Sequence, residues 1–425
     1  MTRRLFFSLS ALPAVAQNVE RARTGVGPLK ISRVESFVVR TPGAKIAPES
    51  VVQMTPPGAM TGGVGLWNRL DHASPSRSRG QTQAVLVKVT TSQGLVGWGE
   101  CHAPEAPRVH QTIISDLFGP VLTGQNALDV EPLWEKLYST ERLRGYSTGF
   151  YTEALAGCDI ALWDILGKFT GQPLYRLLGG KYRDRIPTYT GLGGGSLIAL
   201  QENARKALEQ GFVVMKMGLS KGSGTNDIAR VAAAAEAVKG KGQVLVDSLG
   251  AFKLYEAVQL GHELDRLGNI GWWEDALAPD DTEGYPKLAA AVDTAIVAGE
   301  EVCNRFQARD LLVSKSVDIM NPDVCRAGGI TEMKRIATLA DAHGVLWSPH
   351  ISTGTALYVS ASVNLAVATP NAVIMEGGST LSGPLGNVLL REPLEWKPGW
   401  IAAPERPGLG VEFDEKALGK VIASA

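Results

Sequence analysis

Three short apolar stretches that each end on an acid decide the fold: Gln243-Val-Leu-Val-Asp247, Ile270-Gly-Trp-Trp-Glu274 and Ala295-Ile-Val-Ala-Gly-Glu300. Each has the length and apolar content of a buried parallel strand, and a helical pattern separates it from the next. Repetition of this strand–helix unit indicates an α/β protein whose strands are joined by helices. The acids therefore occupy equivalent positions, at the carboxyl ends of consecutive strands.

The same unit recurs on both sides of this stretch. Further strand-like stretches lie at 186–190, 212–217, 317–320, 345–348 and 373–375. Eight strands, each followed by helical or loop residues, predict a modified (β/α)8 TIM-type barrel rather than an open doubly wound sheet. We expect the barrel domain to span 151–389. The weakly periodic C-terminal segment 390–425 is expected to pack back on the first domain, at residues 28–150.

The pattern of residues 28–150 predicts an α+β domain with its own sheet, which precedes the barrel. An apolar strand is expected at 29–39, a hairpin turns at Gln93-Gly94, and a helical pattern begins near 108. The Gly-, Pro- and Ser-rich segment 41–80 lies between the first strand and the hairpin. We interpret it as a lid loop that closes over a site, the alternative being a disordered surface loop. Its candidate contact residues are Met54, Met60, Trp67, Arg77 and Arg79.

Residues 1–17 have the pattern of an export signal. Arg3-Arg4 is followed by a short apolar stretch, and Ala14-Val15-Ala16 precedes Gln17 as a cleavage motif. The arginine pair is typical of a twin-arginine signal. This predicts an exported, periplasmic protein, or a cytoplasmic one if the start codon is misassigned.

The composition narrows the class of partner. The chain has 425 residues, of which 44% are hydrophobic, and its 42 Lys and Arg nearly balance 43 Asp and Glu. This balance argues against nucleic-acid binding, and no apolar run is long enough to span a membrane. Without metal or disulfide spacing, the cysteines are expected to be buried small hydrophobes: Cys101, Cys158, Cys303 and Cys325. We expect a homo-oligomer.

Asp247, Glu274 and Glu300 are the candidate metal ligands. Taken singly, each acid could be a surface or cap residue, but three acids at the ends of consecutive strands meet at one rim of a barrel. Like charges at close range repel strongly in a partly dry site, and a divalent cation would keep all three ionised. Ligand sets made only of oxygen favour Mg²⁺.

Four further residues at strand ends are candidates for catalysis. Asp323 and His350 end neighbouring strands, where a carboxylate would orient the imidazole as a general base, although a lone histidine after proline is often structural. Lys216 would need an anion such as a substrate carboxylate, unless it snorkels to solvent. Glu376 could hold a proton and donate a hydrogen bond to that carboxylate, unless it is a salt-bridged acid at the rim. Together these groups fit abstraction of a proton α to a carboxylate.

Beyond residue 28, the chain resembles the enolase superfamily and, within it, the mandelate racemase subgroup. The motifs that carry the resemblance are Gly97–Glu100, Ala156–Asp164, Gly211-Phe212 with Lys216, Asp247, Glu274, Gly299-Glu300, Asp323 with Gly328-Gly329, His350, Glu376 and Pro407–Glu412. The resemblance implies a capping domain over a modified barrel, Mg²⁺ and a small-molecule carboxylate substrate. It implies that the three strand-end acids bind the metal, that His350 with Asp323 is the base, and that Glu376 supports an enediolate.

Two departures from the subgroup bear on the reaction. The subgroup usually has Lys-x-Lys on the second strand, but here Gly218 follows Lys216, and Leu249 stands where an asparagine is common. If Lys216 is the first lysine, only His350 remains as a base, which favours dehydration of a sugar acid (an aldonate or aldarate) to a 2-keto-3-deoxy acid. If Lys216 is the second lysine, a racemase or epimerase becomes the alternative. A further alternative is a non-catalytic exported protein that binds acid sugars.

Overall fold

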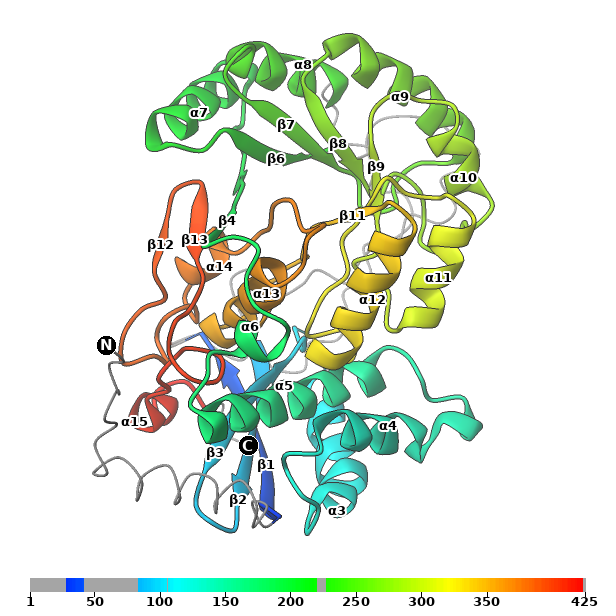
Figure 1. The fold of residues 1–425 in the computed structure, drawn as a ribbon. Coiled ribbons are helices and arrows are strands. Elements are labelled where there is room, and N and C mark those ends of the chain that lie inside the picture. The colour runs from blue at the N-terminus through cyan, green and yellow to red at the C-terminus, as the bar shows by residue number, and fades with distance from the viewer. Residues whose placement is uncertain (1–27, 42–82, 105, 220–226, 423–425) are drawn as a thin grey trace, which may run out of the picture.

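The computed structural model describes residues 28–41, 83–104, 106–219 and 227–422 (Figure 1). The predicted export signal and nearly all of the predicted lid loop, including its methionines, tryptophan and arginines, lie outside the described residues. Within the described part, one mixed α+β unit lies at the bottom of Figure 1 and a ring of alternating strands and helices lies above it.

The N-terminal unit is built on an antiparallel sheet of three strands, β1 (Ile31–Arg40), β2 (Gln83–Thr91) and β3 (Val96–Cys101), in that order. The turn between β2 and β3 lies at the predicted place, with Gly94 at a φ of 80°, a left-handed conformation that glycine adopts at little cost. Most side chains of β2 and β3 are buried because helices cover the sheet.

Helices fill the rest of this unit, as the periodicity predicts. They are α2 (Pro107–Thr112), the π-helical turn η3 (Ile113–Phe118), α3 (Gly119–Leu122), α4 (Val130–Thr140), the 3-10 turn η4 (Arg142–Arg144), α5 (Phe150–Thr170) and α6 (Leu174–Leu177). Helix α5 is apolar on nearly all sides because it lies between the sheet and the barrel. On its barrel side, Asp159 accepts hydrogen bonds from the backbone N–H and the hydroxyl of Thr331 at 2.9 and 2.6 Å.

The barrel strands form a parallel sheet in the order β11-β10-β9-β8-β7-β6-β5. Their bounds are β5 (Thr190–Gly191), β6 (Val214–Gly218), β7 (Gln243–Asp247), β8 (Ile270–Glu274), β9 (Ile296–Ala298), β10 (Ile319–Met320) and β11 (Leu346–Trp347). Parallel bridges from Trp347 to Ala372 and from Thr188 to Met375 close the ring. The predicted barrel fold is therefore confirmed.

Two barrel strands differ from their predicted form. The stretch 186–190 is divided: β4 (Arg185–Pro187) pairs with a strand from the C-terminal segment, and only β5 belongs to the barrel. Pro187, which has no N–H to donate, lies at the point of division. The stretch 373–375 closes the ring through single bridges instead of a regular strand.

Helices surround the barrel strands on the outside of the ring (Figure 1). They are α7 (Leu197–Gln210), α8 (Asp227–Val238), α9 (Leu254–Leu267), α10 (Gly284–Ala289), α11 (Arg305–Val313), α12 (Ile330–Ala342), α13 (Ala356–Val367) and α14 (Gly378–Leu381). Most are amphipathic, but every residue of α13 is buried, because this helix lies between the barrel and the N-terminal unit. Its position matters for the site described below.

The C-terminal segment contains β12 (Trp396–Lys397), β13 (Trp400–Ala402) and α15 (Glu415–Leu418). Strand β13 pairs with β4 beside the barrel. Further along, the ring of Phe413 stacks on Trp98 of the N-terminal sheet at 3.9 Å between centroids, and the N–H of Arg40 donates to the carbonyl of Val421 at 2.8 Å. The segment thus contacts both parts of the chain.

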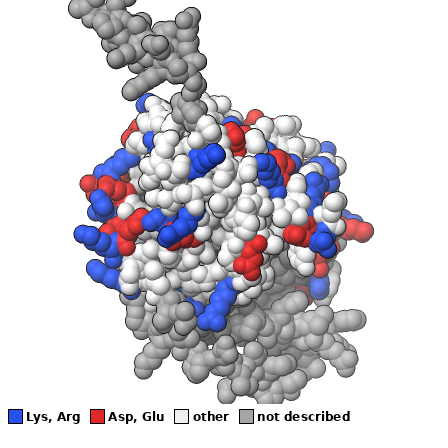
Figure 2. Space-filling view, turned by 90° about the horizontal axis from the view of Figure 1, so that it is seen from below, with Lys and Arg blue, Asp and Glu red and all other residues white. Residues whose placement is uncertain are grey.

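The distribution of surface charge and the burial of the cysteines agree with what the composition predicts. In Figure 2, which views the molecule from below, positive and negative side chains are interspersed over the described face. Among the described residues, no helix is long and apolar enough to cross a membrane. All four cysteines are buried and free, as predicted.

The contact between β3 and α5 yields a prediction about stability. A Cβ atom on Gly99 would lie 2.0 Å from the carbonyl oxygen of Gly157, so Gly99→Ala must push the strand and helix apart. We expect this change to cost about 1–3 kcal/mol or more and to lower the midpoint of thermal unfolding. Gly195→Ala is the matched control, because no described atom lies within 4 Å of its Cβ. Equal midpoints for the two variants would contradict this packing argument.

Candidate active site

The register of the barrel strands brings the predicted acids to one rim. Asp247 pairs with Glu274 across β7 and β8, and Gly218 of β6 pairs with Asp247, so these positions lie at one level. Asp323 and His350 lie further around the same rim, joined by a parallel bridge. This rim is the carboxyl end of the barrel, where enzymes of this architecture hold their sites.

Lys216 lies among three carboxylates at this rim. Its Nζ atom is 3.1 Å from Asp247 Oδ2, 3.0 Å from Glu274 Oε1 and 2.9 Å from Glu376 Oε1. Burial by itself would lower the pKa of this lysine, but the anionic groups around it raise the pKa well above its ordinary value. Lys216 is therefore a cation that points into the site, as predicted, and does not extend to solvent.

His350 and Asp323 form the expected pair. His350 Nδ1 lies 2.7 Å from Asp323 Oδ2, which leaves Nε2 directed at the site, 3.1 Å from Glu300 Oε2 and 3.8 Å from Glu376 Oε2. Burial opposes protonation of the imidazole, but the charge of Glu300 and the hydrogen bond with Asp323 raise the pKa of His350 to about 10. Because Glu300 makes the largest single contribution to this rise, the pKa of His350 depends on what else Glu300 binds.

Asp323 is held by three donors in a fully buried position. It accepts hydrogen bonds from His350 Nδ1, from the backbone N–H of Cys325 at 2.8 Å and from the hydroxyl of Tyr358. Burial would raise the pKa of this carboxyl, but the hydrogen bond with His350 and the positive charges nearby together outweigh it, and the pKa is lowered. Sequence analysis missed Tyr358, which lies on α13, because no motif marks it.

Helix α13 is anchored by a residue from the N-terminal sheet. The carboxylate of Glu100 on β3 accepts hydrogen bonds from the N–H of Thr355 at 3.0 Å, from its hydroxyl at 2.5 Å and from the N–H of Tyr358 at 3.3 Å. Complete burial raises the pKa of Glu100 to about 7 despite these hydrogen bonds. The N-terminal unit thereby helps to place Tyr358, and through it Asp323.

Glu376 connects the lysine to the histidine. One of its oxygens lies against Lys216, while the other accepts a hydrogen bond from the backbone N–H of Ile351 at 2.9 Å. Burial would raise the pKa of Glu376, but the charges of Lys216 and His350 together with the hydrogen bonds outweigh it, and the pKa is lowered. In this structure Glu376 therefore accepts hydrogen bonds, whereas the sequence predicts a protonated donor.

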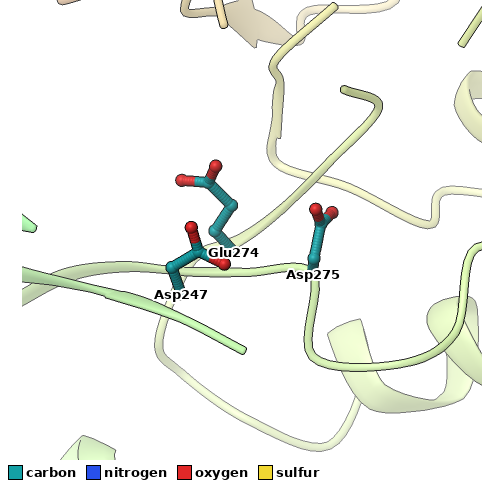
Figure 3. A group of neighbouring side chains, drawn as sticks. All are labelled: Asp247, Glu274 and Asp275. Carbon is teal, nitrogen blue, oxygen red and sulfur yellow. The ribbon is translucent and has the colours of Figure 1, made fainter. Parts of the chain in front are cut away.

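The predicted metal ligands do not form one compact group. In the described part of the chain, acidic oxygens within 4.8 Å of one another occur as Asp247, Glu274 and Asp275 (Figure 3) and as Asp275, Glu300 and Glu301. Glu300 is thus separate from Asp247 and Glu274, and it faces His350 instead. Asp275 belongs to both groups but is not predicted from the sequence. The only sign of it in the sequence is that it directly follows Glu274, a predicted metal ligand.

Both departures from the subgroup pattern line one cavity of about 360 Å³ beside Lys216. Its lining residues are Gly191, Leu192, Gly193, Lys216, Met217, Gly218, Asp247 and Leu249. At Gly218, where a second lysine is usual, there is no side chain to act as a base. Apart from Lys216 and Asp247, the residues that line this cavity are glycine or apolar, and His350 is not among them.

The comparisons with known proteins cover both parts of the chain. Residues 67–179 match the family model described as "Mandelate racemase / muconate lactonizing enzyme, N-terminal domain". Residues 199–417 match the model described as "Enolase C-terminal domain-like". The two matches fall on the N-terminal unit and on the barrel with most of the C-terminal segment.

Individual relatives and solved structures are also similar to this chain over most of its length. The chain is 34% identical to D-galactarolactone cycloisomerase from Agrobacterium fabrum, over 79% of this chain and 90% of that protein. It is 33% identical to D-galactonate dehydratase from Verminephrobacter eiseniae, over 78% and 89%. The structure of 3,6-anhydro-D-galactonate cycloisomerase from Zobellia galactanivorans superposes with a TM-score of 0.76 at 28% identity, covering 93% of this chain and all of the other (100%).

The anchor of α13 yields a prediction about pH. Because the pKa of Glu100 is about 7 in the folded protein against an ordinary 4.5, folding favours its protonated form, and stability is lost as the pH rises through this range. Between pH 5 and pH 8, the free energy of unfolding should fall by about 2–3 kcal/mol more in the unaltered protein than in Glu100→Gln. Chemical denaturation at both pH values measures the difference.

Glu209→Gln is the control for this pH dependence, because Glu209 is exposed on α7. It should follow the unaltered protein at both pH values. An unchanged pH dependence in Glu100→Gln would show that the buried carboxyl does not take up a proton on folding.

Proposed function

The chain belongs to the mandelate racemase/muconate lactonizing enzyme family of the enolase superfamily, and from this membership and the geometry of the site we propose that it is a Mg²⁺-dependent dehydratase of a sugar acid, an aldonate or an aldarate. The observation that carries the proposal is the presence of one oriented base, His350 on Asp323, opposite a position, Gly218, that offers none. The dehydratase relatives support the same reaction class.

The acidic residues fit a magnesium ion. All the atoms that they offer to a metal ion are oxygen atoms. Asp275 Oδ1 is buried and has no hydrogen-bond partner among the described residues, and a bound cation would give it one. We propose that Asp247, Glu274 and Glu300 hold the ion, which requires Glu300 to turn from His350. A bound Mg²⁺ ion would stabilise negative charge that develops on the substrate carboxylate.

The side chains of this chain then divide the work. Lys216, a buried cation, would bind and neutralise the substrate carboxylate. Once Glu300 has turned to the ion, His350 loses the carboxylate that raises its pKa the most, and its neutral Nε2 would take the proton from the α-carbon, while Asp323 holds the Nδ1–H and stabilises the charged imidazole. The electron pair of the broken C–H bond moves toward the carboxylate to give an enediolate. This pair then forms the Cα–Cβ double bond as the β-hydroxyl takes the proton held by His350 and leaves as water, and the enol tautomerises to a 2-keto-3-deoxy acid.

A second candidate is cycloisomerisation of a sugar-acid lactone, favoured by the 34% identity to D-galactarolactone cycloisomerase. The same proton is removed, and a ring oxygen leaves in place of hydroxide. Racemisation has less support, since it needs a base on each face of the substrate and Gly218 supplies none. A binding protein without turnover has less support still, because it has no need of an oriented His–Asp pair.

The reaction class is tested by product analysis. We expect the protein with Mg²⁺ to convert at least one member of an acid-sugar library to a 2-keto-3-deoxy acid, detected as a 2-keto acid. In D₂O, deuterium at the α-carbon of recovered substrate without elimination would indicate a racemase instead. Conversion of only the lactones would favour the cycloisomerase, and tight binding with neither reaction would favour a binding protein.

The base is tested by His350→Asn. We expect turnover to fall by roughly 10²–10⁴-fold or more because the group that takes the proton is lost, while affinity for Mg²⁺ changes little. His343→Asn, an exposed histidine at the end of α12, is the control and should keep full activity. Steady-state kinetics and metal titration measure both effects, and a normal rate for His350→Asn would refute the assignment of the base.

A further inference from the structure

Asp275 directly follows Glu274 in the loop after β8 and is held firmly by its own backbone. Its N–H donates to the carbonyl of Val297 at 2.9 Å, and its carbonyl accepts from the N–H of Gly250 at 2.7 Å. It is therefore tied to β9 on one side and to the loop after β7 on the other. Its φ of 43° turns the backbone out of the strand conformation at this residue.

The side chain of Asp275 lies between the two groups of acids. Its carboxylate is within 4.8 Å of donor atoms of Asp247 and Glu274 on one side and of Glu300 and Glu301 on the other. Figure 3 shows it beside the carboxylates of Asp247 and Glu274, all from neighbouring strand ends. No other described residue belongs to both groups.

Two buried oxygen atoms at this place lack a partner among the described residues. Asp275 is only 7% exposed and its Oδ1 accepts no hydrogen bond; Asn321 is 2% exposed and its Oδ1 accepts none, although its amide donates to Glu274 Oε1 at 3.1 Å. An unsatisfied buried carboxylate is costly, and native proteins rarely keep one without a ligand. A cation would satisfy it.

We propose that Asp275 is itself a ligand of the divalent cation, and that its carboxylate joins the pair Asp247 and Glu274 to Glu300 in a single metal centre. This inference rests on the proposed function, in which those three acids hold Mg²⁺. It adds a fourth carboxylate, which no sequence motif assigns, and it gives the unpartnered oxygen a partner. The centre is then built across the ends of β7, β8 and β9.

The test is titration of Mn²⁺, as a probe for Mg²⁺, into the full-length protein and into Asp275→Asn. The substitution keeps the size of the side chain and removes its charge. We expect its dissociation constant for Mn²⁺ to rise roughly 10- to 100-fold, measured by calorimetry and by the loss of the free-ion signal in electron paramagnetic resonance. Asp280→Asn removes one exposed charge from the same loop and should bind Mn²⁺ normally.

The midpoint of thermal unfolding, measured with and without Mn²⁺, gives a second test that does not depend on the binding titration. Without metal, Asp275→Asn should unfold at a temperature no lower than the unaltered protein, because the change removes from among the neighbouring acids a buried carboxyl whose Oδ1 has no partner, and Mn²⁺ should raise its midpoint less. Asp275→Ser is the second neutral variant if the first does not fold. Normal Mn²⁺ affinity in a folded variant overturns the role of Asp275 and leaves the dehydratase proposal intact. Failure of the unaltered protein to bind Mn²⁺ overturns both.

Discussion

Repulsion between carboxylates at the mouth of the barrel is the constraint on which the site depends. The strand register forces Asp247 and Glu274 to the same level, and the next strand end adds Glu300. Two cations make this tolerable: Lys216 lies against the first two acids and Glu376, and His350 lies between Glu300 and Asp323. The fold brings the carboxylates close together, and the positive charges of Lys216 and His350 offset their repulsion.

The sequence predicts this arrangement well wherever side-chain position follows from strand order. The ends of parallel strands meet at one rim, so the apolar runs before Asp247, Glu274 and His350 were enough to bring these residues together. Strand order says less about which way a side chain turns after its strand ends. The φ of 43° at Asp275 places a fourth carboxylate among the acids, and Glu300 turns toward His350; neither follows from the spacing of apolar residues.

Contacts between distant segments were equally hard to predict. Glu100 lies 255 residues before Thr355 in the sequence, and its hydrogen bond with Thr355 holds the start of α13. From this helix the hydroxyl of Tyr358 donates to Asp323. No local pattern marks a hydrogen bond of that range, and the division of the first barrel strand into β4 and β5 likewise depends on pairing with the C-terminal segment. The N-terminal unit thus helps to hold the pair formed by His350 and Asp323 in place.

The glycine-walled cavity beside Lys216 has a consequence for stereochemistry. Under the proposed function, Gly218 has no side chain to act as a base and His350 approaches from another part of the rim, so hydrogen would be removed from the substrate on one side only. Under the proposed function the two prochiral faces of the enediolate are therefore unequal. Of two mirror-image substrates bound by the same carboxylate contact, only one would then present its carbon-bound hydrogen to His350, so the position of the base would select between them.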